Sequence, residues 1–141
     1  HDRIGYSLKE LTLDLTLLLD TSTCCGGLNV YGSPWSMEFL NWAFMLPEPE
    51  LAKKWAAIPD NTNILLLHGP PHGYGDRTTD GLHVGSPSLT ERIRKVRPRL
   101  VVCGHIHESH GVYDLDGIPI VNASLLNERY RMVNQPIVFE I

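Results

Sequence analysis

The sequence is poor in cysteine, with only 3 cysteines in 141 residues. An odd number that includes the adjacent pair Cys24-Cys25 does not fit the disulfide framework of a small secreted domain. Cys103 ends the apolar run Leu100-Val101-Val102 and is expected to be a small buried residue. These features predict a reducing, cytoplasmic environment.

Long apolar runs and an excess of positive charge are absent as well. No stretch reaches the roughly 18 apolar residues that indicate a membrane span. The chain has 12 Lys and Arg against 16 Asp and Glu, a formal net charge of −4. Proteins that bind a nucleic-acid backbone carry a basic face, whereas the basic cluster from Arg92 to Arg99 fits the solvated side of a helix. We therefore expect neither a membrane nor an extended nucleic acid as a partner.

The chain also lacks an initiator methionine, because it begins with His1-Asp2 and shows no signal-peptide pattern. Proteolytic processing explains such a beginning, and a fragment of a longer gene product explains it at least as well. Its 141 residues, 43% of them hydrophobic and 20% charged, predict one globular domain over residues 1–141.

The distribution of apolar residues predicts an α/β fold with an antiparallel finish. Apolar runs at 28–32, 64–67 and 100–103 predict strands, and a helix is expected from about 48 to 58. Ser88 with Glu91 three residues later forms a capping-box pattern, which predicts a helix from there to about Val96. Further strands are expected within 7–20, at 111–115, at 118–121 and at 137–141, with an Asp116-Gly117 turn joining the second and third of these.

Two of the predicted strands end in histidine, at the edge where open α/β sheets bind their ligands. His68 precedes Gly69-Pro70-Pro71, and the two prolines stiffen that loop. His105 and His107 stand two positions apart, so that in an extended segment both imidazoles project to the same side. Neutral imidazole binds zinc, iron, manganese, copper and nickel. We therefore predict that His105 and His107 bind metal and that His68 is a third ligand.

These residues resemble the last two motifs of the calcineurin-like metallophosphoesterases, as His68-Gly69 and Gly104-His105-Ile106-His107-Glu108. His1-Asp2 is similar to the end of that family's Gly-Asn-His-Asp/Glu motif. With Tyr31-Gly32-Ser33-Pro34-Trp35 and Val121-Asn122-Ala123-Ser124, the ordered set resembles the small branch of metallophosphoesterase-domain, class III phosphodiesterase-like proteins. The resemblance covers nearly the whole chain.

The resemblance implies a layered β-sandwich flanked by helices, of which this chain would be the C-terminal part without its N-terminal portion. It implies two divalent metal ions (Mn, Fe or Zn), with His68 and His105 binding one metal and His107 the other. His1 would be catalytic, as the general acid that protonates the leaving oxygen. The implied reaction is hydrolysis of phosphomonoesters or phosphodiesters, cyclic nucleotides and other small nucleotides among them, through a metal-bound hydroxide.

The sequence departs from the family pattern because the Asp-x-His motif, the Gly-Asp motif and the Asn before His1 do not occur upstream of the histidine motifs. These 141 residues alone are therefore expected to bind metal poorly and to be inactive, although the intact protein would be a hydrolase. The alternative is a non-catalytic metal-binding or nucleotide-binding scaffold. A third hypothesis, a structural zinc module, would require Cys24-Cys25 to approach the histidines.

Other residues carry weaker predictions. Arg77 lies in the Gly/Pro-rich loop and is a candidate for pairing with a substrate phosphate, with a solvated loop as the alternative. Glu108 is expected either to hydrogen-bond a ligating imidazole or to be a surface carboxylate, and Asn122 is expected to be structural. The larger aromatic residues are expected to pack in the core rather than to stack on a nucleobase: Trp35, Phe39, Trp42, Phe44 and Trp55.

Overall fold

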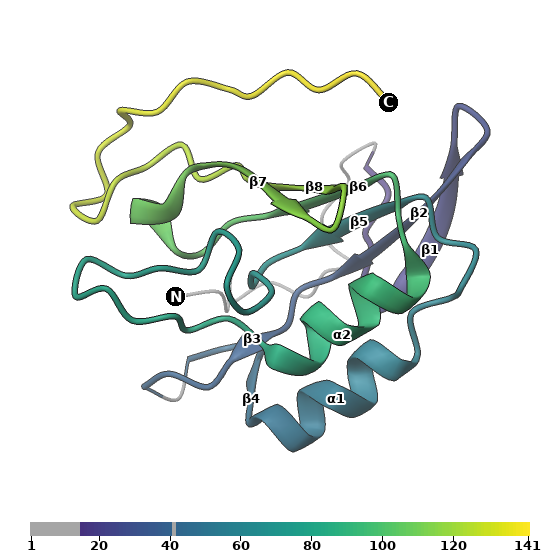
Figure 1. Cartoon of the computed structure of the whole chain (residues 1–141), viewed down its shortest axis with the longest axis horizontal. Helices are drawn as coiled ribbons and strands as arrows, with labels where there is room; N and C mark the ends of the chain where they lie inside the picture. The colour runs from purple at the N-terminus through teal and green to yellow at the C-terminus, as the bar shows by residue number, and fades with distance from the viewer. Residues whose placement is uncertain (1–14, 41) are drawn as a thin grey trace.

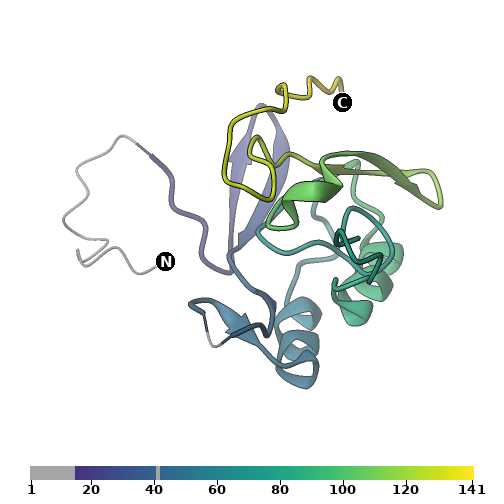
Figure 2. The same ribbon diagram turned by 90° about the vertical axis from the view of Figure 1, so that its left-hand side faces the viewer.

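The computed structural model describes residues 15–40 and 42–141 and shows the α/β class that the sequence predicted (Figure 1). Six strands form one sheet in the order β1-β2-β5-β6-β8-β7. A two-stranded sheet pairs β3 with β4, and Figure 2 shows it beside α1 at the margin of the main sheet. The strands are β1 Thr21–Cys25, β2 Leu28–Ser33, β3 Ser36–Met37, β4 Met45–Leu46, β5 Ile64–Leu67, β6 Leu100–Cys103, β7 Gly111–Leu115 and β8 Ile118–Asn122.

The centre of the main sheet is parallel. β2 pairs with β5, β5 with β6, and β6 with β8, all in parallel, while β1 and β7 add antiparallel hairpins at the two edges. Leu65, Val101 and Ile120 on these central strands are fully buried. The carboxyl ends of β5 and β6 therefore lie next to each other, and both are followed by a histidine.

Two helices pack side by side against the sheet (Figure 1). α1 spans Glu48–Ala56 and α2 spans Pro87–Val96. Leu51 and Trp55 of α1, with Leu89 and Ile93 of α2, are buried to 1% exposure or less in the same core as the central strands. No helix in the described part of the chain has the length and apolar character that a membrane crossing requires.

The start of α2 differs from the capping-box prediction. Its N-cap is Ser86, whose Oγ accepts the Leu89 N–H at 3.3 Å, and Pro87 occupies the first helical position, where its missing N–H is no loss. The Ser88 N–H instead donates to Oε1 of Glu48 at 2.7 Å, and the Ser86 hydroxyl donates to Oε2 of the same carboxylate at 2.8 Å. One carboxylate at the start of α1 thus fixes the start of α2.

Two predicted strands are not found. Residues 137–141 form no strand in the structure, and Val138 is 89% exposed. Strand propensity depends on cross-strand neighbours, and no described strand pairs with this stretch. Of the expected strand within 7–20, residues 7–14 lie outside the described residues and 15–20 are not a strand; β1 begins after them, at Thr21.

The Ser86 cap supplies a stability prediction. Ser86→Ala removes the cap of α2 and also the acceptor of the buried Trp55 indole N–H, which lies 2.9 Å from Ser86 Oγ. We expect a loss of about 2 kcal/mol in the free energy of unfolding, measured by urea denaturation. The matched control, Ser88→Ala, is expected to cost under about 0.5 kcal/mol. Equal losses in the two variants would support the sequence prediction that Ser88 caps α2.

Candidate metallophosphoesterase site

The parallel pairing of β5 and β6 brings two histidines together. His68 follows β5 directly, and His105 follows β6 after Gly104. The Gly104 N–H donates to the His68 carbonyl oxygen at 3.0 Å, which holds the two loops against each other. The centroids of the His68 and His105 rings are 4.6 Å apart, with their planes inclined by 49°. This is the imidazole pair that the strand ends predicted.

The backbone at His105 is turned in a way that the sequence did not indicate. His105 has φ +68°, in the left-handed region that non-glycine residues seldom occupy. His107 then begins a short 3-10 helix, His107–Ser109. Both imidazoles line the same pocket, but a left-handed residue followed by a helical turn directs them there, not the alternation of an extended strand.

Asn122, at the end of β8, holds this turn in place. Its Nδ2 donates to the carbonyl oxygens of Gly75 and Ile106, each at 2.8 Å, and its Oδ1 accepts the Ser124 N–H at 3.1 Å. The side chain is fully buried. The structural role predicted for Asn122 is thus visible as a bridge between β8, the histidine loop and the Gly/Pro-rich loop.

His107 presents one ring nitrogen for ligation. Its Nδ1 lies 2.9 Å from the carbonyl oxygen of Asn127. Because a carbonyl oxygen only accepts, Nδ1 carries the proton and Nε2 keeps a lone pair. The Tyr130 ring packs edge-on against the imidazole, with centroids 5.1 Å apart. Metal-binding histidines are commonly oriented by such a hydrogen bond to the second nitrogen.

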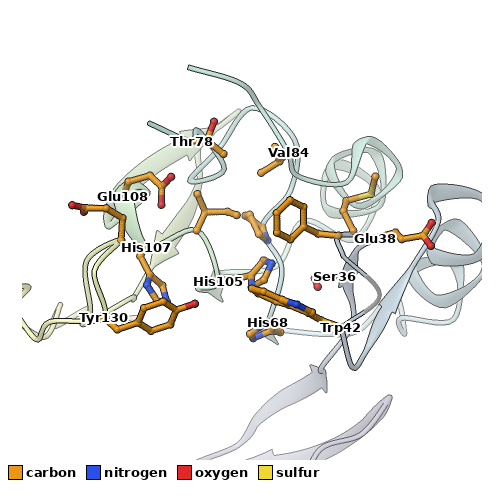
Figure 3. Close-up of a pocket in the computed structure, with 15 residues that line it drawn as sticks. Ser36, Glu38, Trp42, His68, Thr78, Val84, His105, His107, Glu108 and Tyr130 are labelled. Atoms are coloured by element: carbon orange, nitrogen blue, oxygen red, sulfur yellow. The ribbon is translucent and has the colours of Figure 1, made fainter. Parts of the chain in front are cut away.

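The three histidines line a pocket of about 880 Å³. Figure 3 shows His105 between Trp42 with His68 on one side and His107 with Tyr130 on the other. Three carboxylates, Glu38, Glu108 and Glu128, also line it, and no Lys or Arg of the described residues does.

A buried hydroxyl in the pocket has no hydrogen-bond partner. Ser36 is 2% exposed, and its Oγ is unpaired among the described residues. It lies against Gly69, where a Cβ would meet the Ser36 Cα and Cβ at 2.9 and 2.7 Å, so glycine is required for this approach. Three other buried side-chain atoms, Arg92 Nε, His110 Nδ1 and Ser124 Oγ, are likewise unpaired among the described residues.

The pocket histidines are the right type of ligand for divalent transition metals, but they are too few to complete a site. Neutral imidazoles suit such ions, and the ring pair of His68 and His105 is close enough to share one. Among residues 15–40 and 42–141, however, no three or more His, Cys, Asp or Glu side chains gather closely enough to hold a metal. The described histidines are therefore of the type that binds metal, but within the described part of the chain they are not joined by further ligands into a complete site.

The other predicted site residues lie elsewhere. His1 falls outside the described residues. Arg77 is exposed, lies beside Gly81 and is not brought into the pocket, so contact with a substrate stays a prediction. Glu108 lines the pocket but accepts the Thr79 N–H at 3.0 Å, and no hydrogen bond joins it to a described imidazole.

Sequence reasoning missed the role of Asp76, a fully buried carboxylate in the Gly/Pro-rich loop. Its Oδ2 accepts the N–H groups of Gly73 and Gly85, and its Oδ1 lies 2.7 Å from Nδ1 of His83. Burial, and then the charge of Asp76, raise the pKa of Cys103 to about 12, so this thiol is neutral, buried and inert, as expected. The signal was an Asp that directly follows the Gly73-Tyr74-Gly75 segment of the loop.

Two aromatic residues expected in the core line the pocket instead. Phe39 is 55% exposed, and its ring meets that of Trp42 edge-on at a centroid distance of 5.5 Å. A turn closed by the Trp42 N–H, which donates to the Phe39 carbonyl oxygen at 3.3 Å, sets their spacing. Trp55 is buried, as expected. The pocket position of Phe39 follows from loop geometry, which residue type alone does not reveal.

Asp20 ties the segment that leads into this loop to β2 and α1. Its carboxylate accepts hydrogen bonds from Ser33 Oγ, Trp35 Nε1 and Lys54 Nζ at 2.7 to 2.8 Å. Burial raises the pKa of Asp20, but the hydrogen bonds from Lys54, Trp35 and Ser33 outweigh it, and the net pKa is lowered. The Trp35 ring in turn packs edge-on against Phe44 at 5.6 Å, on the return arm of the loop.

The family of the chain follows from comparison with known proteins. Residues 44–136 match the family model described as metallophosphoesterase, calcineurin superfamily. The chain belongs to the calcineurin superfamily of metallophosphoesterases. The matched segment contains all three pocket histidines, so the resemblance carried by His68-Gly69 and Gly104-His105-Ile106-His107 is confirmed at the level of the family.

Curated relatives within this superfamily are longer than the chain. Metallophosphoesterase domain-containing protein 1 of Homo sapiens is 38% identical over 138 residues, which are 96% of this chain and 42% of that protein. UPF0046 protein T07D4.2 of Caenorhabditis elegans is 35% identical over 139 residues, 97% of this chain and 35% of that protein. The chain thus spans about two fifths of the length of these relatives.

A solved metallophosphoesterase-like fold is similar as well. The crystal structure of TT1561 of Thermus thermophilus has a TM-score of 0.50 at 19% identity, covering 74% of this chain and 48% of that one. Another crystal structure reaches a TM-score of 0.58 at 20% identity and covers 76% of this chain and 45% of that one. At these identities the likeness concerns the fold alone.

Removal of the Asn122 amide is expected to loosen the histidine turn. Asn122→Ala leaves the Gly75 and Ile106 carbonyls without their donor, which should lower the free energy of unfolding by about 2–4 kcal/mol. The matched control Asn134→Ala removes one hydrogen bond to the Ser124 carbonyl oxygen. It should lower the free energy of unfolding by under about 1 kcal/mol. Chemical denaturation measures both, and similar losses would contradict the bridging role.

Asp20→Asn is expected to destabilise the aromatic loop in a pH-dependent way. Because the folded-state pKa of Asp20 is lowered, its contribution is present above the ordinary value of 3.8 and is lost as the pH falls through the folded-state pKa. We expect a deficit of about 1 kcal/mol at pH 7, where partial exposure limits the gain, and a vanishing deficit near pH 2. A deficit that is constant over pH 2–7, measured by thermal denaturation, would show that the charge is unimportant.

Proposed function

We propose that the intact protein is a metal-dependent phosphoesterase that hydrolyses small phosphomonoesters or phosphodiesters. The observation that carries the proposal is the imidazole pair of His68 and His105, 4.6 Å apart at the ends of two parallel strands, with His107 in the same pocket. Membership in the superfamily supports the same reaction class.

The roles proposed for the three histidines come from the family resemblance, and their placement is compatible with them. His68 and His105 would together hold one divalent ion, and His107 would bind a second one through Nε2. When bound, such ions orient the phosphate, offset its developing charge and lower the pKa of water. The chain's part is to hold the imidazoles at fixed angles, through the Asn127 carbonyl and the Asn122 amide.

Two features of the proposed site depend on residues beyond the described ones. The bridging carboxylate is absent from the neighbourhood of the described histidines. His1 is the proposed proton donor to the leaving oxygen, by its likeness to the family motif. Manganese, iron or zinc are all compatible with imidazole and carboxylate donors.

The charge around the pocket favours a small substrate. Without a described Lys or Arg in its lining, the phosphate charge has to be offset by the bound ions, and three carboxylates discourage a polyanion. A nucleic-acid strand is therefore disfavoured as the substrate.

A second function, a non-catalytic metal-binding or nucleotide-binding scaffold, is favoured by one observation. The described residues gather fewer than three ligand side chains at any point, which is a weak metal site. The experiment described next decides between this function and the phosphoesterase.

The test uses the full-length protein loaded with Mn²⁺. The substrate is bis(p-nitrophenyl) phosphate. His68→Ala, His105→Ala and His107→Ala are each expected to lower kcat/KM by about a hundredfold or more, because each removes a ligand. The control His72→Ala removes an imidazole that does not line the pocket and should leave the rate unchanged. Metal content, measured by elemental analysis, should fall only in the first three variants.

Two outcomes would contradict the proposal. A metal-loaded, folded protein without turnover of any phosphate ester would establish the scaffold instead. Turnover that survives all three histidine substitutions would place the reaction elsewhere in the protein.

A further inference from the structure

The pocket wall beside the histidines has features that phosphate chemistry does not use. A phosphate and its ions need imidazoles and oxygens, yet Phe39 and Trp42 line the same space with an edge-to-face ring pair. Single exposed aromatic residues are ordinary on protein surfaces. Here the exposed ring belongs to a pair that a backbone hydrogen bond holds together, and Figure 3 shows its Trp42 member beside His68 and His105.

The charges of the pocket restrict the occupant further. Glu38 stands beside the ring pair in sequence and lines the pocket, with Glu108 and Glu128 as the other carboxylates. An anionic group on these walls would face like charges with no described Lys or Arg to compensate. An uncharged flat ring would instead stack on aromatic faces and avoid that repulsion.

We propose that Phe39 and Trp42 form a subsite for an uncharged aromatic group of the substrate. This inference rests on the proposed phosphoesterase function and names the class of ester: one whose organic group is an aryl or heteroaryl ring. Trp42 lies beside His68 and His105 (Figure 3), and Phe39 supplies an exposed ring that a variant can remove with little effect on the fold.

The test compares two non-hydrolysable ligands that differ only in aromaticity. Phenylphosphonate and cyclohexylphosphonate carry the same anionic group and rings of similar size. Calorimetric titration of the full-length, Mn²⁺-loaded protein should show phenylphosphonate binding about tenfold more tightly, the value of one good aromatic contact. In Phe39→Leu the preference should fall below about threefold, while affinity for cyclohexylphosphonate stays within about twofold.

A matched control uses Phe139→Ala, which removes an exposed phenylalanine outside the pocket and should keep the tenfold preference. In the wild type, 4-carboxyphenylphosphonate should bind more weakly than phenylphosphonate. Glu38→Gln should reduce this difference in affinity between the two ligands. A wild-type preference under twofold, or one that Phe39→Leu leaves intact, would overturn the subsite.

The two proposals fail in different ways. Ester hydrolysis without any preference for aromatic ligands would contradict the subsite and support the phosphoesterase function. An aromatic preference in a protein that hydrolyses no ester would leave a ligand-binding pocket and remove the enzyme.

Discussion

The buried amide of Asn122 is the contact on which the rest of the site depends. From the end of β8 it reaches the Gly/Pro-rich loop at Gly75 and the histidine turn at Ile106, two segments that are more than 30 residues apart in sequence. Because both carbonyls bond one rigid side chain, the turn keeps His105 in its left-handed conformation. The parallel pairing of β5 and β6 then places His68 opposite His105. The sheet sets the location of the imidazoles and the amide sets their direction.

The parts of the fold that follow from local patterning could be predicted. The apolar runs at 64–67 and 100–103 became β5 and β6 with those bounds, because four apolar residues bounded by loop residues have little alternative to a buried strand. His68 and His105 were found by the same logic, as residues that follow strands. Their meeting at one edge required only that the two strands be parallel neighbours, which α/β order favours.

The parts that failed depend on partners distant in sequence. Ser86 and Ser88 are both plausible caps by type, and Glu48, 38 and 40 residues away, decides between them. Residues 137–141 have strand composition but no described neighbour to pair with. Phe39 has the composition of a core residue, yet a turn closed onto Trp42 directs it to a pocket.

The aromatic pair and the imidazoles belong to different structural units. The imidazoles follow the central strands of the main sheet, whereas Phe39 and Trp42 lie on a connection between β3 and β4, the strands of the small separate sheet. With the roles proposed above, substitutions or insertions in that connection would alter which molecule is admitted without displacing His68, His105 or His107. Over evolutionary time, descendants of this chain can therefore change what they recognise while inheriting the same reaction, since the two properties are free to diverge on separate pieces of backbone.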